Sequence, residues 1–269
     1  MSTTDNHTTA DPQAAIELSG VISKLGGVQV LDDVNLTIPS GRITALLGPS
    51  GAGKTVTVKH ILGLMKPAKG RVVVEGRNLR RISDEELNEL RRGMGVVLQG
   101  TLPFTCGLFF SLNVYDNVAF ALRQRTNWSE PKINEATLAH LDMVGMRERA
   151  DAMPDELSAG MCKRTALARA LALEARIVII DDFDSGLDGV RLALLTELIR
   201  DAQRDTGATF LVTTHDMTTA RELADHAAVI HDGRIVASGD ADSIFGSTDP
   251  LVRQLISGGT AGPLQLQSP

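Results

Sequence analysis

Residues 48–55 have the types and spacing of a phosphate-binding loop. The segment reads Gly48-Pro49-Ser50-Gly51-Ala52-Gly53-Lys54-Thr55 and matches G-x-x-x-x-G-K-[ST] at every defined position. Its glycines let backbone N–H groups turn inward around phosphate oxygens, Lys54 reaches the terminal phosphates, and Thr55 can ligate magnesium. We therefore predict that this loop, with Val56 after it, binds a nucleoside triphosphate and Mg²⁺.

Two carboxylates close an apolar run far downstream of that loop. Asp181 and Asp182 follow Ile177-Val178-Ile179-Ile180, a short run typical of a buried strand. An aspartate at a strand end is often only a turn former. In a protein with a phosphate-binding loop, however, such a strand places a carboxylate beside the magnesium ion. We predict that Asp181 is a magnesium ligand.

Alternating strands and helices must position these residues. The phosphate-binding loop follows an apolar run at 43–47 and precedes a helical pattern at 54–64. The same order returns later, with strands at 94–98, 177–181 and 209–213 and helices at 189–203 and 217–224. This alternation predicts an α/β protein with a parallel sheet covered on both faces.

Other segments flank or interrupt this core. Alternating runs at 16–22 and 34–38, separated by Gly26-Gly27, predict a small antiparallel layer. Helical patterns at 114–123, 130–141 and 166–173 predict an inserted helical subdomain over about 100–165. We expect one folded domain over 15–256, a disordered N-terminal tail over 1–14 and a Gly/Pro-rich tail over 257–269.

Composition narrows the class of partner. The net charge is −6 without a clustered basic surface, which argues against nucleic-acid binding. Cys106 and Cys162 are the only cysteines, too few for a disulfide framework or a thiolate metal site. No window of 18 apolar residues occurs, so we predict that any membrane contact goes through another subunit.

The segment Leu157-Ser158-Ala159-Gly160-Met161, between the phosphate-binding loop and Asp181, resembles the signature of ABC transporter ATP-binding subunits. The resemblance covers about 16–260 and implies a P-loop NTPase with a RecA-like core, an antiparallel β subdomain and an inserted helical subdomain. It further implies an ATP-hydrolysing homodimer. In that dimer, Ser158, Ala159 and Gly160 approach the γ-phosphate bound to the opposite subunit.

The same resemblance implies roles for three further positions. His215 matches the switch histidine that hydrogen-bonds the γ-phosphate, and Gln99 matches the glutamine that touches magnesium and the attacking water. Residues 185–188 match the loop that links the two active sites of a dimer. Together with Asp182, His215 and Gln99 form the expected catalytic set, and Gln99 joins Thr55 and Asp181 as an expected metal ligand.

Three positions depart from the family pattern. Asp182 stands where a catalytic glutamate is usual, which withdraws the carboxylate by roughly 1.5 Å. Ala159 replaces a glycine, and a methyl group fits there only if its φ is negative. Leu25 stands where an aromatic side chain usually stacks on adenine. These departures predict weak nucleotide binding or slow hydrolysis, and they leave open whether Asp182 is a weak base or only a charge.

Within the ABC family, several segments of the chain resemble the Mla/Mce lipid-transport ATPases. The matching segments are 112–123, 153–154, 160–164, 184–191 and 249–254. This similarity implies integral permease subunits, an MCE-domain protein that carries phospholipid or sterol, and a place on the cytoplasmic face of the inner membrane. Gly100 to Gly107 lengthens the loop after Gln99, where a permease would dock; this segment either encodes permease specificity or is a tolerated insertion.

Two alternatives remain open from the sequence. One is an ABC ATPase for another substrate. The other is a nucleotide-binding regulatory subunit that dimerises on ATP with little hydrolysis, for which Asp182, Ala159 and Leu25 are the motivation.

Overall fold

The computed structural model describes residues 14–98, 107–259 and 262–264. Within these residues the strands form a four-stranded sheet of order β2-β1-β4-β5 and a six-stranded sheet of order β10-β9-β3-β8-β7-β6. The strands are β1 (Ala14–Leu25), β2 (Val28–Pro39), β3 (Ile43–Leu47), β4 (Lys69–Val74), β5 (Arg77–Asn78), β6 (Met94–Val97), β7 (Ile177–Ile180), β8 (Thr209–Thr214), β9 (His226–His231) and β10 (Arg234–Asp240).

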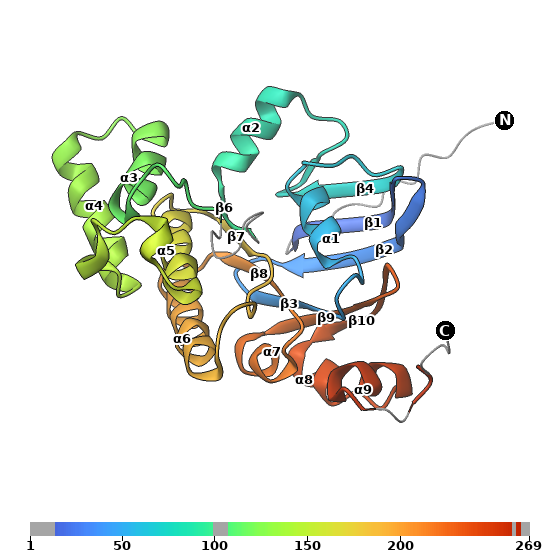
Figure 1. Cartoon of the computed structure of the whole chain (residues 1–269). Helices are drawn as coiled ribbons and strands as arrows, with labels where there is room; N and C mark the ends of the chain where they lie inside the picture. The colour runs from blue at the N-terminus through green and yellow to red at the C-terminus, as the bar shows by residue number, and fades with distance from the viewer. Residues whose placement is uncertain (1–13, 99–106, 260–261, 265–269) are drawn as a thin grey trace.

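Helices cover the larger sheet and form a separate group beside it. They are α1 (Lys54–Ile61), α2 (Asp84–Arg92), α3 (Val114–Arg125), α4 (Glu130–Met143), α5 (Ala159–Leu171), α6 (Gly189–Thr206), α7 (Met217–Leu223), α8 (Ala241–Phe245) and α9 (Pro250–Ser257), with 3-10 turns at Arg147–Arg149 and Pro154–Glu156. Figure 1 shows α3 and α4 on the opposite side of the molecule from β1, β2 and β4.

The larger sheet contains the strands that the apolar runs predict. β3, β7 and β8 are buried along their whole lengths. β8 pairs in parallel with both β3 and β7, and β6 pairs in parallel with β7. Parallel strands end at one edge of a sheet, so the loops after β3, β7 and β8 meet there. The predicted parallel sheet is confirmed, with an additional antiparallel edge strand, β10.

The antiparallel layer is also confirmed, but its strands are longer than predicted. β1 and β2 have 12 residues each and meet at Gly26-Gly27, where φ is 56° and 86°. The register shifts between Leu18 and Val21 on β1. Gly20 and Asp33 lie near this irregularity with φ of 61° and 54°. Bulges of this kind interrupt the two-residue alternation, so the sequence pattern reveals only part of each strand.

The helix predicted to begin at Ala166 begins instead at Ala159. Ser158 caps it, with its Oγ accepting a hydrogen bond from the Met161 N–H at 3.3 Å. Serine is among the preferred N-cap residues. The prediction was wrong at this end because Ala159, Gly160 and Lys163 dilute the apolar periodicity of the first turns. The signature segment therefore forms the N-terminal turn of α5.

α2 is a helix that the hydrophobic pattern does not predict. It is strongly polar, and only Leu90 is buried. A capping box begins it: the Glu86 N–H donates to Ser83 Oγ at 3.2 Å, and the Ser83 N–H donates to Glu86 Oε2 at 2.7 Å. The Ser-x-x-Glu spacing is a readable start signal. It could have located this helix where periodicity could not.

A tight turn at Gly233, between β9 and β10, joins three parts of the fold. Its N–H donates to the carbonyl of Ala52 in the phosphate-binding loop at 3.1 Å, and its carbonyl accepts from the Asp32 N–H of β2 at 2.8 Å. Arg234 also forms an ion pair with Asp32. A Cβ at Gly233 would lie 2.3 Å from the carbonyl oxygen of Val30, so the approach requires glycine. Through these bonds the turn connects β2 to the phosphate-binding loop.

Candidate functional site

The phosphate-binding loop runs from the end of β3 to the start of α1. Gly53 is the N-cap of α1 with φ of 111°, a conformation that favours glycine. A Cβ at Gly48 would lie 2.2 Å from the carbonyl oxygen of Ile230, so close packing against β9 excludes a side chain there. The loop therefore has the strand, glycine loop and helix order that the motif requires.

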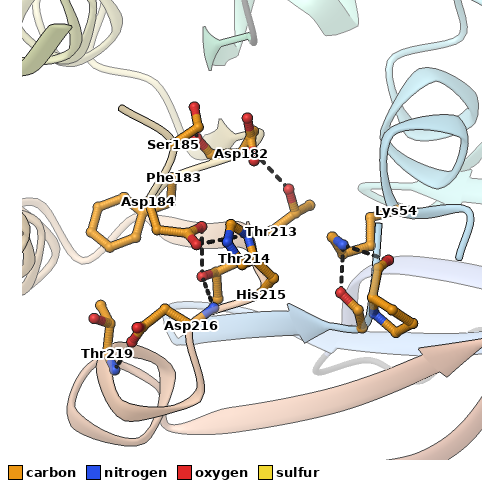
Figure 2. A network of polar contacts seen from close by, with 12 residues as sticks. Lys54, Asp182, Phe183, Asp184, Ser185, Thr213, Thr214, His215, Asp216 and Thr219 are labelled. Carbon is orange, nitrogen blue, oxygen red and sulfur yellow. Dashed lines mark hydrogen bonds and ion pairs between the residues drawn. The ribbon is translucent and has the colours of Figure 1, made fainter. Parts of the chain in front are cut away.

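Lys54 lies within this loop. Its Nζ donates to the carbonyl oxygens of Gly48 at 2.6 Å and Pro49 at 3.0 Å (Figure 2). Burial lowers the pKa of the ammonium from its ordinary value, while the charges of the aspartates after β7 oppose that shift. Lys54 is thus held by neutral carbonyls, which phosphate oxygens could replace as stronger acceptors.

Asp181 ends the strand run, as predicted, and its carboxylate is held by β8. Asp181 is 3% exposed, and its Oδ1 accepts a hydrogen bond from Thr213 Oγ1 at 2.6 Å. The same Thr213 oxygen accepts from the Asp182 N–H at 2.9 Å. One buried threonine therefore fixes the positions of both aspartates. This role of Thr213 was not recognised in the sequence.

Asp182 has an unusual backbone conformation. Its φ is 61°, in the left-handed region where aspartate is tolerated better than most residues. Its carbonyl accepts a hydrogen bond from Lys163 Nζ at 2.8 Å, while its N–H is bound to Thr213. Because both its N–H and its carbonyl are hydrogen-bonded, the backbone of Asp182 is held in place, and the reach of the carboxylate depends on the length and rotamer of the side chain.

Lys163 donates several hydrogen bonds to the loop after β7 through its side-chain ammonium group. It is 5% exposed and projects from α5 into the loop after β7. Its Nζ also donates to the carbonyl oxygens of Phe183 at 2.6 Å and Ser185 at 2.7 Å. Sequence reasoning missed this residue. Positions 163, 166, 167 and 170 share one helix face, and the three apolar members signal that the lysine is buried with them.

His215 and Asp184 form a second polar group beside the aspartates. His215 Nδ1 lies 2.7 Å from Asp184 Oδ2, and Thr214 Oγ1 donates to Asp184 Oδ1 at 2.7 Å. Figure 2 shows Asp182, Asp184 and His215 together, with Lys54 facing them from across the site. Asp184 was not singled out in the sequence because an aspartate in a turn has an ordinary explanation.

One cavity brings together residues from several predicted motifs. Its volume is about 380 Å³, and its lining comprises Val30, Ser50, Gly51, Gly53, Lys54, Thr55, Val56, Asp181, Asp182 and Thr213. Oxygen ligands of this kind suit magnesium. The buried Asp181 carboxylate and Thr55 share the cavity, so the residues present fit a magnesium-bound triphosphate.

Other predicted residues lie elsewhere. Ser158, Ala159, Gly160 and His215 are not part of this described cavity lining. Ala159 is the first residue of α5 and does not have a positive φ, so its methyl group meets the conformational condition stated above. Gln99 and all of the Gly100–Gly107 segment except Gly107 lie outside the described residues.

Two larger hollows lie away from the phosphate-binding loop. One of about 740 Å³ includes Met217 and Arg253, and one of about 800 Å³ includes Ala14 and His140. The volume of a cavity alone therefore does not identify the candidate nucleotide site in this protein. Among the described residues, no helix is long and apolar enough to cross a membrane.

Comparisons with known proteins find similar sequences. The family model described as "ABC transporter" matches residues 31–185. The probable ribonucleotide transport ATP-binding protein mkl of Mycobacterium tuberculosis (strain ATCC 25618 / H37Rv) is 38% identical over 93% of this chain and 68% of its own length. The intermembrane phospholipid transport system ATP-binding protein MlaF of Escherichia coli (strain K12) is 36% identical over 94% of this chain and 93% of its own.

Solved structures show the same fold. CbiO1 from Clostridium perfringens, part of the ABC transporter complex cbiONQ, has a TM-score of 0.78 and 25% identity over 90% of this chain and 94% of that one. The ATP-binding cassette MJ0796, as a dimer in a post-hydrolysis state bound to ADP and Pi, has a TM-score of 0.75 and 29% identity over 84% of this chain and 98% of that one.

Proposed function

Because the chain belongs to the ABC transporter family as an ATP-binding subunit, we propose that it hydrolyses magnesium-bound ATP to drive lipid transport across the cell envelope. One observation carries this proposal: the pair Lys54-Thr55 and the pair Asp181-Asp182 line a single cavity although they lie far apart in the sequence. The loop after β3 supplies the Lys54 ammonium and N–H groups for phosphates, and the loop after β7 supplies carboxylates for a metal ion and a water molecule.

Each residue has a definite task in this proposal. Lys54 exchanges its carbonyl partners for phosphate oxygens, and the loop residues from Gly48 to Val56 enclose the phosphates. Thr55 and Asp181, together with Gln99 as the family resemblance implies, would hold magnesium, which when bound would offset charge on the phosphates. Asp182 orients the attacking water and accepts its proton. His215 contacts the γ-phosphate.

Hydrolysis at this site is slow. Asp182 is one methylene shorter than glutamate, and its peptide is hydrogen-bonded on both sides. A misplacement of about 1 Å can lower a rate on the order of 100-fold. Leu25 is 44% exposed and Val28 is 67% exposed, which offers the base an apolar contact without an aromatic ring. These observations also support the regulatory alternative, in which ATP binding rather than turnover is the output.

Two copies of the chain form the active unit. Ser158, Ala159 and Gly160 lie at the N-terminus of α5, which favours an anion, but they are not part of the lining of their own cavity. A partner's nucleotide is the ligand that this arrangement suits. The dimeric MJ0796 structure bound to ADP and Pi supports the same organisation.

Lipid is the favoured transport substrate. MlaF, a phospholipid transport protein by name, aligns with 93% of its own length, whereas mkl, named for ribonucleotide transport, aligns with 68%. The subunit then lies on the cytoplasmic face of the inner membrane, bound to integral permeases that act with an MCE-domain lipid carrier. The ribonucleotide assignment of mkl keeps an ABC ATPase for another substrate as the second candidate.

Two measurements test these proposals. The purified chain should show magnesium-dependent phosphate release that Lys54→Ala abolishes and Lys59→Ala, on an exposed face of α1, leaves intact. Activity that survives Lys54→Ala would contradict the site. Affinity purification from native membranes with mass spectrometry should recover an MCE-type permease and bound lipid. Recovery of a different permease without lipid would favour the second candidate.

A further inference from the structure

Asp184 is a buried carboxylate with no role in the motifs described above. It lies in the loop between β7 and α6, and its side chain is 4% exposed. Two neighbours at the end of β8 bind it: Thr214 Oγ1 donates to Oδ1, and His215 Nδ1 approaches Oδ2, each at 2.7 Å. Burial of a carboxylate is costly unless it is paired and hydrogen-bonded. Both of its oxygens have a partner here.

The loop that carries Asp184 is held rigidly on both sides. Lys163 Nζ binds the carbonyl oxygens of Asp182, Phe183 and Ser185, the residues around Asp184. The Phe183 N–H donates to the Thr213 carbonyl at 3.0 Å, and the Phe183 ring is fully buried. The Asp184 carboxylate therefore has a defined position relative to the end of β8.

This contact decides which nitrogen of His215 is free. An ionised carboxylate only accepts hydrogen bonds, so Nδ1 carries a proton in the contact. Nε2 is then the only other polar atom of the ring. The His215 side chain is 57% exposed, and an exposed imidazole without such a partner rotates and exchanges between its two neutral forms.

We propose that Asp184 is a positioning residue for ATP hydrolysis, which holds His215 through Nδ1 so that Nε2 is presented to the phosphate. This role rests on the proposed ATPase function. Its structural basis is independent of nucleotide, because the Asp184–His215 contact exists within one chain. One carboxylate oxygen of Asp182, one of Asp184 and one ring nitrogen of His215 lie within 4.8 Å of one another, so the pair is adjacent to the proposed base.

The first arm of the test is spectroscopic and needs no activity. The full chain labelled with ¹⁵N-histidine contains six histidines, and His215→Gln identifies the signal of interest. In the neutral form of the ring, the wild type should show His215 with its proton on Nδ1. Asp184→Ala should give a mixture of both neutral forms. Asp184→Asn, whose amide oxygen can still accept, should retain most of the Nδ1–H form.

The second arm is kinetic. Asp184→Ala should lower kcat by 10-fold or more with a KM for ATP within about 2-fold of the wild type, since the nucleotide cavity does not include Asp184. Asp184→Asn should recover part of that loss. A purely structural role would instead lower the melting temperature without the change in the nitrogen spectrum.

The outcomes separate the two proposals. An unchanged His215 spectrum in Asp184→Ala overturns the positioning role whatever the activity. A changed spectrum with an unchanged kcat shows that hydrolysis does not use the pair, and this also overturns the role. If the wild type itself lacks ATPase activity, the proposed function fails, while the spectrum still decides whether Asp184 holds His215.

Discussion

At the scale of single residues, side-chain length and backbone conformation together determine how far the Asp182 carboxylate can reach. The left-handed φ of 61° at Asp182 and the hydrogen bonds of its N–H and carbonyl fix where the side chain starts. With the backbone held, the reach of the carboxylate toward a nucleotide is set by the length and rotamer of the side chain. This explains physically why the shorter residue should limit the rate and why a small change could restore it.

Asp182→Glu should raise kcat, by up to on the order of 100-fold, because the added methylene extends the carboxylate toward the water. Glutamate tolerates the left-handed region less well than aspartate, so stability should fall by about 1 kcal/mol. Phosphate release by the assembled complex and thermal unfolding measure the two effects. Asp182→Asn, which keeps the size and removes the charge, is the control and should be inactive. An unchanged kcat in Asp182→Glu would mean that the short carboxylate is not limiting.

At the scale of elements, the sequence predicts best where local composition determines structure. β7 is a continuous apolar run and β3 is apolar except for Thr44, and both lie next to recognisable motifs, so their positions follow from the pattern. The start of α5 depends on the Ser158 cap, and the lengths of β1 and β2 depend on bulges, so periodicity misplaces them. The helix cap and the β-bulges each interrupt the regular spacing of apolar residues, which is about 3.6 in a helix and about 2 in a strand.

The tertiary contacts of the site could not be predicted in the same way. Lys163 meets the loop after β7 only because α5 packs beside that loop. Thr213 joins Asp181 to β8 across 32 positions of sequence. No local pattern encodes a bond of this kind. The motif residues could be identified because each motif is a short continuous segment of sequence. Thr213 and Lys163, which hold the motif residues in place, reach them only through the tertiary fold.

Ser158→Asp tests the proposed role of the signature helix. Aspartate is a good N-cap, so α5 should keep its stability. Its charge would repel a partner's γ-phosphate, so the ATP-dependent dimer should be lost while nucleotide binding to Lys54 remains. Light scattering with and without ATP, and a fluorescent nucleotide, measure the two properties.

Ser158→Thr, which retains both the cap and the hydroxyl, is the matched control and should dimerise. Loss of nucleotide binding in monomeric Ser158→Asp would contradict the proposal, because the signature would then shape its own subunit's site.

Lys163→Met should destabilise the loop after β7. It removes the donor shared by three carbonyls. Ser185 Oγ still donates to the carbonyl of Asp182, but the carbonyls of Phe183 and Ser185 lose this donor beside an apolar side chain, at a cost of about 3 kcal/mol. Urea unfolding of the isolated chain measures this. Lys59→Met, at an exposed position of α1, should change stability by no more than about 0.5 kcal/mol. Equal effects of the two substitutions would show that the ammonium does not organise the loop.

At the scale of the whole molecule, a buried histidine links stability to pH. His60 is 1% exposed, its Nδ1 lies 3.0 Å from the carbonyl of Met65, and its Nε2 has no hydrogen-bond partner among the described residues. Burial lowers the pKa of this imidazole, and the bond to Met65 opposes the shift. The unfolded chain therefore binds a proton at a higher pH than the folded chain does.

Stability should consequently fall as the pH drops through the ordinary histidine pKa of about 6.5, and the contribution of His60 should be fully lost below its lower folded-state pKa. His60→Gln should reduce this slope by at most about 1.4 kcal/mol per pH unit. Urea unfolding between about pH 7.5 and 5 measures it. His226, whose pKa burial also lowers, should leave a residual slope. His140→Gln is the control, and an equal change there would contradict the assignment to His60.

The turn at Gly233 has a consequence for cooperativity. It bonds Ala52 of the phosphate-binding loop and Asp32 of β2, so segments from the two sheets cannot separate without breaking the same turn. Such connected segments tend to open as one unit in amide hydrogen exchange. Nucleotide bound at the phosphates should therefore slow exchange along β2 as well, including amides that no nucleotide atom touches. Slower amide exchange on β2 would then report nucleotide binding, although the sequence of β2 contains no part of the phosphate-binding motif.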